Sequence, residues 1–222
     1  MSGTVLEKCA STRILGVTFD NRLTFALHIN KIISEAWRTL GFIIRVSKNF
    51  TNLKAIKLLY NTFVRPKLEY ASLVWSPIQL GQSTRLEKVQ RKFLKFLIWK
   101  RSGEYPLRGT ADLALCSECN YHTLAERRIC AEFAFATKLF NNLVHCPQLL
   151  AMFKFKEPIL GLRSHVPMYT SVARNNLAQA APIYRMSETV NRFYTLESSL
   201  DPLSCPNGYV TASLGNLATK WR

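Results

Sequence analysis

Apolar residues recur at helical spacing through most of the first half of the chain. Between about Leu27 and Val46 they fall every three or four positions, which predicts one long helix. Thr51 or Asn52 is suited to cap a second helix, whose apolar face carries Tyr60. A third helix is predicted from about Ser83 to Trp99. The pattern therefore predicts a bundle of helices.

One segment of this half shows the alternation of a strand. Residues 13–19, RILGVTF, place Leu15, Val17 and Phe19 on one face, and an Asp-Asn pair supplies a turn after them. Because a lone strand leaves backbone groups unpaired, we expect its partner strands to belong to a longer protein of which this chain is the end.

The stretch FVRPKLEYASLVWSP, which starts at residue 63, follows the second helix. Pro66 either interrupts that helix or begins a new one in its first turn, and a Ser-Pro pair ends a short helix near Trp75. Glu69 lies among apolar residues, but no second carboxylate or histidine accompanies it in the stretch. We expect Glu69 to be a structural partner of Arg65 or Lys67, or of a cation on a neighbouring helix, rather than a general acid.

The second half is less regular. A loop from Gly103 to Gly109 is the best candidate for a domain boundary. A fourth helix is predicted from roughly Thr123 to Val144, starting with a capping box formed by Thr123 and Glu126. Pro147 opens a short helix, and beyond Pro158 the prolines and polar turns predict little regular structure. No apolar run approaches the ~18 residues needed to cross a bilayer.

Charge changes this picture of a plain helical protein. The chain carries a formal net charge of +16 in 222 residues. Residues 1–102 hold 18 basic and 5 acidic side chains, whereas residues 103–222 hold 12 and 9. The first half is therefore typical of a protein that binds a polyanion, with nucleic acid as the leading candidate.

The predicted third helix concentrates this charge on the side opposite its apolar stripe. Its basic residues there are Arg85, Lys88, Arg91, Lys92 and Lys95. A run of this kind is usually a solvated outer face, but ordinary surface helices mix signs, and here Glu87 is the acid nearby. Trp99 lies in the same arc, where it either stacks on a base or sugar or packs against the helix end.

Catalytic patterns are missing. Cys116, Cys119 and His122, with Cys130 further on, have part of a zinc-site spacing, but packed or chance thiols are the favoured interpretation. The sequence contains no nucleophile elbow, Walker loop or dinucleotide fingerprint, and its three aspartates are far apart. The six cysteines, irregularly spaced, indicate reduced thiols in a cytosolic or nuclear protein. The chain thus has the charge of a polynucleotide enzyme without its catalytic acids.

Several long segments resemble one family. They are RILGVTFDNRLTFALHINKI, LGFIIRVSKNF, LKAIKLLYNTFVRPKLEYASLVWSP, LEKVQRKFLKFL, TLAERRICAEFAFATKLFNNLVHCPQLL, RSH and ARNNLAQAAPIYRMSETVNRFY. In this order they resemble the C-terminal part of the reverse transcriptase of non-LTR retrotransposons, of the LINE type and similar to Jockey and X-element. The resemblance covers roughly Val5 to Tyr194, and the last 28 residues depart from it.

The resemblance implies roles for particular residues. Arg13, Leu15 and Gly16 match the primer grip, the last hairpin of the polymerase palm, where a glycine permits close approach of the primer end. The helices from 27 to 102 match the thumb, which holds the template–primer duplex through its phosphates. The nucleic-acid-binding residues implied on the thumb are Arg85, Lys88, Arg91, Lys92, Lys95 and Trp99.

The expected fold is mainly α: a thumb-like bundle with a short N-terminal β remnant of the palm, then a helical and irregular C-terminal region. We expect four parts, at residues 1–26, 27–102, 103–195 and 196–222. The family's Phe-x-Asp-Asp motif is not in this sequence, so we expect no catalytic or metal-binding residue here, although the parent family is a nucleotidyltransferase.

The expected partners are an RNA–DNA or DNA duplex and the missing fingers and palm, with no membrane. Magnesium is expected only for the full-length polymerase. The chain is then a fragment of an RNA-directed DNA polymerase, inactive alone, of nuclear or cytoplasmic location. The alternative is a stand-alone, non-enzymatic nucleic-acid-binding protein derived from a transposon.

Overall fold

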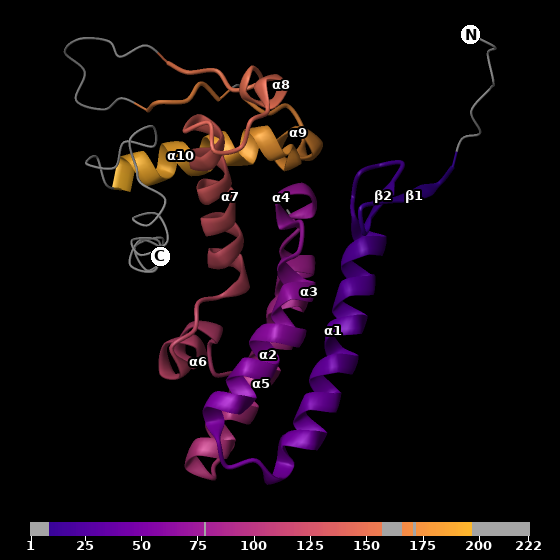
Figure 1. Ribbon diagram of the computed structural model, residues 1–222, viewed down its shortest axis with the longest axis vertical. Coiled ribbons are helices and arrows are strands. Elements are labelled where there is room, and N and C mark those ends of the chain that lie inside the picture. Colours follow the sequence, from indigo (N-terminus) through magenta and orange to yellow (C-terminus); the bar gives the residue numbers. More distant parts are fainter. Residues whose placement is uncertain (1–8, 78, 157–165, 171, 197–222) are drawn as a thin grey trace. The chain divides into compact units, whose positions relative to one another are not determined.

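The computed structural model describes residues 9–77, 79–156, 166–170 and 172–196. These residues are mainly helical, with a small two-stranded sheet near the N-terminus, as the sequence predicts (Figure 1). They form two compact units. Unit 1 comprises the described residues up to Ala71 together with Gln79–Pro106, and unit 2 comprises the described residues from Ser72 to Pro77 and from Leu107 onward. Of the predicted tail at 196–222, residues 197–222 lie outside the described residues.

Unit 1 is built from a hairpin and helices. Its elements are β1 (Ser11–Ile14), β2 (Val17–Asp20), α1 (Ala26–Val46), the 3-10 helix η1 (Ser47–Asn49), α2 (Leu53–Phe63), α3 (Arg65–Glu69) and α5 (Leu80–Ser102).

The predicted single strand at 13–19 is wrong. The segment is a β-hairpin, in which β1 and β2 pair antiparallel and Ile14 lies opposite Val17. The chain reverses at Leu15 and Gly16, both of which have positive φ, 46° and 87°. This is the backbone geometry of a two-residue hairpin turn whose twist suits the flanking strands. The partner strand that the sequence analysis expected elsewhere is therefore the second half of the same segment.

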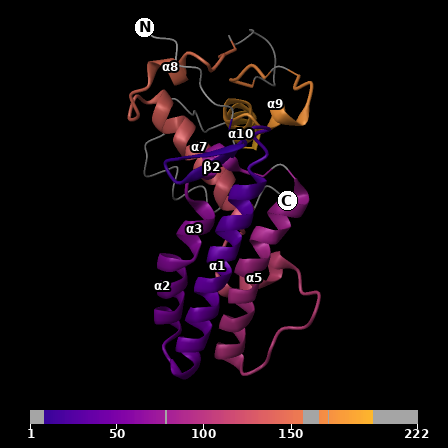
Figure 2. The same ribbon diagram turned by 90° about the vertical axis from the view of Figure 1, so that its right-hand side faces the viewer.

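Three helices of unit 1 lie side by side, as Figure 2 shows for α1, α2 and α5. The apolar spacing that predicted α1 is confirmed, because residues such as Ile29, Ala36 and Leu40 are fully buried. Tyr60 of α2 stacks on Phe93 of α5 with ring centroids 3.9 Å apart. The Tyr60 hydroxyl also donates to the buried amide oxygen of Gln90, 3.2 Å away. These contacts place Gln90 and Phe93 on the buried side of α5, so residues on the opposite side of this helix face outward.

The stretch from residue 63 forms two short helices instead of the predicted single one. Pro66 lies in the first turn of α3, where a missing N–H costs nothing, and the chain kinks at Ala71, whose φ is 54°. A second helix, α4 (Ser72–Trp75), follows and buries Trp75. The predicted pairing of Glu69 is confirmed: its Oε2 lies 3.9 Å from Nε of Arg65.

Unit 2 contains α4 and the helices of the second half of the chain. These are α6 (Asp112–Cys119), α7 (Leu124–Phe140), α8 (Pro147–Leu150), α9 (Asn176–Ala180) and α10 (Pro182–Leu196). The predicted capping box is confirmed, since Thr123 Oγ1 accepts from the N–H of Glu126 and the Glu126 carboxylate accepts from the N–H of Thr123.

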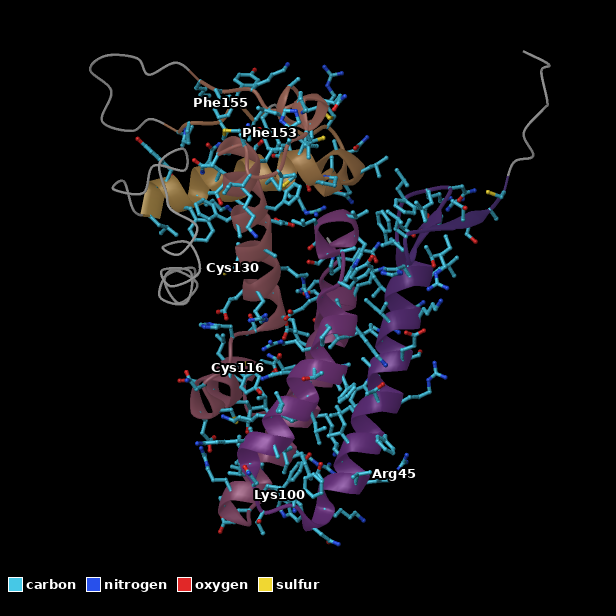
Figure 3. The ribbon with its side chains drawn as sticks, viewed as in Figure 1. Arg45, Lys100, Cys116, Cys130, Phe153 and Phe155 are labelled. Atoms are coloured by element: carbon cyan, nitrogen blue, oxygen red, sulfur yellow. The ribbon has the colours of Figure 1, made fainter. Side chains whose placement is uncertain are left out.

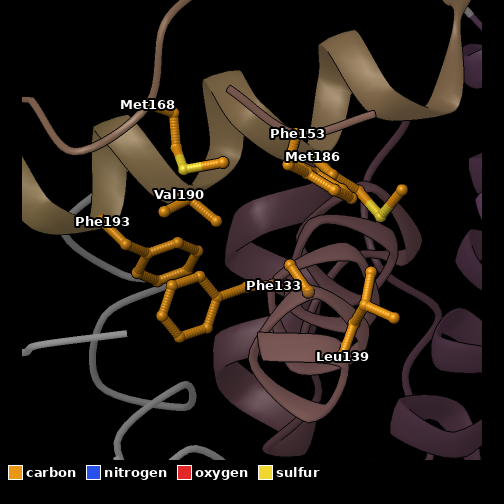
Figure 4. Packing of buried hydrophobic residues seen from close by; sticks show 8 residues of the cluster. Phe133, Leu139, Phe153, Met168, Met186, Val190 and Phe193 are labelled. Carbon is orange, nitrogen blue, oxygen red and sulfur yellow. The ribbon is translucent and has the colours of Figure 1, made fainter. Parts of the chain in front are cut away.

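The core of unit 2 lies between α7 and α10 (Figure 4). Phe133 and Phe193 pack with ring centroids 4.3 Å apart. The buried Asn191 amide makes two hydrogen bonds to the backbone of Met168, of 2.9 and 3.0 Å. The expectation of little regular structure after Pro158 is therefore wrong for α9 and α10.

None of the described helices is long and apolar enough to span a membrane.

Candidate nucleic-acid interface

The outer side of α5 carries a straight row of basic residues. Arg85, Lys88, Lys92 and Lys95 follow one another at intervals of three, four and three residues, and Trp99 comes four later. Residues at these intervals share one face of a helix. The row is opposite the buried stripe of α5, which includes Leu86 and Phe93. At 1.5 Å per residue it extends over about 21 Å.

The acidic content of α5 is low. This helix contains one acidic residue, Glu87, and seven Lys and Arg residues. Glu87 lies four residues before Arg91, so both side chains fall at one edge of the row rather than along it. Arg91 is half-buried, whereas Lys88 and Lys92 are exposed. The middle of the row therefore presents positive charge.

Two side chains outside the row hold parts of it in place. The amide oxygen of Asn30, on α1, accepts a hydrogen bond of 2.7 Å from Nη1 of Arg85. The Tyr105 hydroxyl lies 3.2 Å from Nζ of Lys92, and the same ring has Nζ of Lys92 at 5.4 Å and Nζ of Lys95 at 5.9 Å from its centroid. The loop after α5 thus folds back so that Tyr105 gathers two lysines by cation–π contact.

Trp99 lies within the helix rather than at a frayed end, because α5 continues to Ser102. Its side chain is 38% exposed, and its ring lies 5.9 Å from that of Phe96. Nζ of Lys100 stands 5.6 Å from the Trp99 ring centroid. The Trp99 ring therefore has Phe96 and Lys100 as neighbours, while part of it faces solvent.

The residues matched to the primer grip form the hairpin and its turn. Leu15 is 86% exposed at the tip, and Arg13 is exposed on β1. The Tyr70 hydroxyl donates a hydrogen bond of 3.0 Å to the carbonyl of Leu15. A Cβ at Gly16 would stand 3.5 Å from the Tyr70 ring, which is ordinary contact. The Tyr70 side chain, from the 63–77 stretch, thus supports the turn.

The hairpin and the basic row both attach to the first turns of α1. His28 Nδ1 accepts from the N–H of Thr18 at 3.4 Å, and Asn30, two residues on, bonds Arg85. The row on α5 therefore begins at the end of the bundle that carries the hairpin. The structure brings together the two groups of residues that the sequence named separately.

The titratable groups near the hairpin have structural roles. Burial lowers the pKa of His28 below its ordinary 6.5, and the charges of Lys31 and Arg13 lower it further against an opposing effect of Glu35. Burial alone would raise the pKa of Asp20, but hydrogen bonds from Thr24 and neighbouring backbone N–H groups outweigh it and lower that pKa. Asp20 thereby caps the approach to α1 instead of facing an open site.

The cysteine cluster does not form a metal site in the described part of the chain. No three His, Cys, Asp or Glu residues among the described ones are placed to hold a metal ion. Cys116 and Cys119 lie in α6, and Cys130 lies in α7 (Figure 3). Burial raises the pKa of the Cys130 thiol to about 11, which disfavours the thiolate that a metal requires.

Sequence reasoning missed three residues of this interface. Asn30 and Tyr105 support the basic row, and Tyr70, which is 59% exposed, supports the turn. No local pattern reveals a contact between residues that are 55 apart. Tyr105 had a weaker signal, since an aromatic follows closely on a run of lysines in a loop.

Comparison with known proteins places these observations in context. A protein of Drosophila melanogaster described as "Probable RNA-directed DNA polymerase from transposon BS" is 23% identical to the chain over 129 residues. The match covers 57% of this chain and 14% of that protein. No protein-family model matches the chain, and no solved structure matches it. The similarity supports a reverse-transcriptase-like relationship.

Proposed function

We propose that unit 1 grips the template–primer duplex in the reverse transcriptase of a non-LTR, LINE-type retrotransposon related to Jockey. The row on α5 contacts duplex phosphates, and the Leu15–Gly16 turn approaches the primer end. In this proposal the chain is the C-terminal part of the polymerase, and the aspartates and magnesium ions that join nucleotides belong to a part outside it.

The basic row carries the proposal. Four cations along about 15 Å of one helix face match a rod of closely spaced phosphates better than a compact acidic ligand. Phosphate contacts position a protein on a duplex without reading its sequence, which is what a polymerase needs as it moves. Tyr105 and Asn30 preorganise three of the four cations, so less side-chain freedom is lost on binding.

The turn at Leu15 and Gly16 supports the assignment of the primer end. Gly16 leaves the tip without a Cβ, so a ligand backbone can come close to it. The shared attachment to α1 puts this tip at the start of the basic row. A duplex held along α5 would therefore have one end near the hairpin.

A stand-alone nucleic-acid-binding protein is the second candidate. It is favoured by the fact that the row and both of its supporting residues belong to unit 1. The two candidates differ in how they treat the end of a strand. A primer grip distinguishes a recessed primer end from continuous duplex, and a general binder does not.

Duplex binding by the 222-residue chain tests the proposal. Fluorescence anisotropy with a labelled 20-base-pair RNA–DNA hybrid should show binding, and Lys88→Glu with Lys92→Glu should weaken it roughly 100-fold, since hydrogen bonds to charged groups are worth about 1.5 kcal/mol or more each. Replacing Lys88, Arg91, Lys92 and Lys95 together with Glu should abolish it. The matched control is Arg22→Glu with Lys54→Glu, which makes the same charge change at two exposed positions outside α5.

Equal losses in the test and control variants would show that only net charge matters, and would contradict the proposal. Gly16→Val, assayed on recessed and blunt hybrids, separates the two candidates. A selective loss on the recessed end supports the primer grip, and equal affinities for both ends support the stand-alone binder.

A further inference from the structure

A second basic row lies on the exposed side of α1. Lys31, Arg38 and Arg45 occur at intervals of seven residues, and all three are exposed. Seven residues are nearly two helical turns, so the three side chains leave α1 on the same side, about 10 Å apart along its axis. Glu35 is the acid within α1, and it is half-buried. This row was not recognised from the sequence.

The two helices that carry the rows run parallel. Asn30 bonds Arg85 near one end, and Lys100 donates to the carbonyl of Lys48 at the other (Figure 3 labels Arg45 and Lys100 near that end). A residue that comes a given number of positions after Asn30 in α1 therefore lies at the same level along the helix axes as the residue that comes equally many positions after Arg85 in α5. Trp37 comes seven residues after Asn30 and Lys92 seven after Arg85, so Trp37 lies on the α5 side of α1 at the height of Lys92.

Two exposed aromatic rings flank the α1 row. Trp37 is 39% exposed on the edge toward α5, and Phe42 is 58% exposed close beside the cations, on their side away from α5. At 100° per residue, the three cations fall between these two aromatics on the helix surface. Alternating cations and exposed rings are the composition of surfaces that bind single-stranded nucleic acid, because phosphates meet the cations and unstacked bases stack on the rings.

The rings decide between a single strand and a duplex. Bases within a duplex are stacked on each other, so their faces are not available to Trp37 or Phe42. The rings of the α5 row already have cation neighbours, since Nζ of Lys92 and Lys95 lie 5.4 and 5.9 Å from the Tyr105 centroid and Nζ of Lys100 lies 5.6 Å from that of Trp99. The α1 row therefore matches a strand with free bases. An acidic surface without bases would leave the two rings without stacking partners, and an uncharged surface would leave the three cations without counter-charges.

We infer that the exposed side of α1 is a binding surface for single-stranded nucleic acid, with phosphates on Lys31, Arg38 and Arg45 and bases on Trp37 and Phe42. It shares no residue with the duplex grip on α5 and does not depend on it. A single strand of RNA or DNA supplies the same chemistry, and two probes distinguish them.

The test measures binding of the 222-residue chain to labelled 12-nucleotide oligo(rU), oligo(dT) and the 20-base-pair hybrid. Arg38→Glu with Arg45→Glu should weaken binding of the single strands at least tenfold and leave hybrid affinity within about twofold. It should also lower the slope of log K against log salt by about 1.4, since each phosphate contact on a single strand contributes about 0.7. The control is again Arg22→Glu with Lys54→Glu, and circular dichroism checks that each variant is folded.

Substitution of Trp37 provides a test that does not change the charge of the protein. Trp37→Ala should weaken single-strand binding about tenfold and remove most of the tryptophan fluorescence quenching on binding, whereas Trp37→Phe should retain most of the affinity. Tighter binding of oligo(rU) or of oligo(dT) would identify the strand as RNA or DNA.

Three results would overturn the inference. The wild-type chain could bind neither oligomer, the α1 and control variants could lose affinity equally, or the α1 variant could lose hybrid binding as strongly as single-strand binding. The last result would make α1 part of the duplex surface. Because the duplex grip is tested with Lys88 and Lys92, either proposal can fail while the other stands.

Discussion

The hydroxyl of Tyr70 donates a hydrogen bond of 3.0 Å to the backbone carbonyl of Leu15. The bond joins the residue just after α3 to the tip of the N-terminal hairpin, 55 positions earlier. The positive φ angles of Leu15 and Gly16 set the orientation of this carbonyl, which faces the Tyr70 hydroxyl. The turn proposed to meet a primer end is thus held by the side chain of Tyr70, which lies between α3 and α4 in the sequence.

Tyr70→Phe removes this hydrogen bond and keeps the ring. Because the bond is exposed, we expect the free energy of unfolding to fall by only about 0.5–1 kcal/mol. Hydrogen exchange should be more informative, since the amides of residues 11–20 should exchange severalfold faster while those of α5 change little. Uniformly faster exchange across unit 1 would instead show that Tyr70 supports α3 and not the hairpin.

Gly16→Ala tests the backbone of the turn. Gly16 has a φ of 87°, and a side chain in the left-handed region costs about 1–2 kcal/mol. The unfolding free energy, from urea titration, should fall by that amount. Gly41→Ala is the matched control, because nothing lies within 4 Å of its new Cβ inside α1, and it should raise stability by about 0.5–1 kcal/mol. Equal effects of the two changes would contradict the assigned role of Gly16.

His28 predicts a dependence of stability on pH. Its pKa is lower in the folded chain than the ordinary 6.5, first because of burial and then because of Lys31 and Arg13. The unfolded chain therefore binds the proton more readily, so the stability contributed by neutral His28 is complete above about pH 6.5 and decreases as pH falls below it. Protonation also removes the acceptor that Nδ1 offers to the N–H of Thr18.

Urea titrations between pH 7.5 and 5 measure this effect. His28→Asn keeps an acceptor near the same position but does not titrate, so its stability should change less over this range than that of the wild type. Parallel curves for the two proteins would assign the acid sensitivity to other groups.

Arg185 and Glu132 form a buried ion pair in unit 2. Nε of Arg185 lies 2.9 Å from Oε1 of Glu132, and its Nη2 donates to the carbonyl of Leu73 at 2.6 Å. Removing one member leaves a buried charge uncompensated, so Arg185→Met should cost about 3–5 kcal/mol. Adding Glu132→Met should restore part of the loss, and a denaturation cycle over the four proteins measures the coupling. Additive losses would show that the pair is not coupled.

Residues with regular spacing were predicted well, because one face of a helix must be buried. This holds for Ile29 and Leu40 in α1 and for the box between Thr123 and Glu126, whose geometry is local. Leu15 was misplaced because the apolar alternation continues through the hairpin turn, which lacks an Asn-Gly or Asp-Gly signal. The prediction had no means of finding that this residue has positive φ.

The errors in the second half have different causes. Met186, Val190 and Phe193 have helical spacing, but the prolines before them suggested irregular structure. By contrast, the favoured interpretation of Cys116 and Cys119 as packed or chance thiols agrees with their burial on one side of α6, which a spacing of three suits. The support of Lys92 by Tyr105 depends on the path of a loop, which no periodicity encodes.

The salt dependence of duplex binding tests the central proposal most directly. For the wild-type chain and a variant with Lys88, Arg91, Lys92 and Lys95 replaced by Gln, log K for the RNA–DNA hybrid is measured against log salt between 50 and 200 mM. A grip on phosphates predicts that the variant's slope is smaller by about 3, since each of the three row lysines contributes about 0.9. Equal slopes for the two proteins would contradict a phosphate grip on α5.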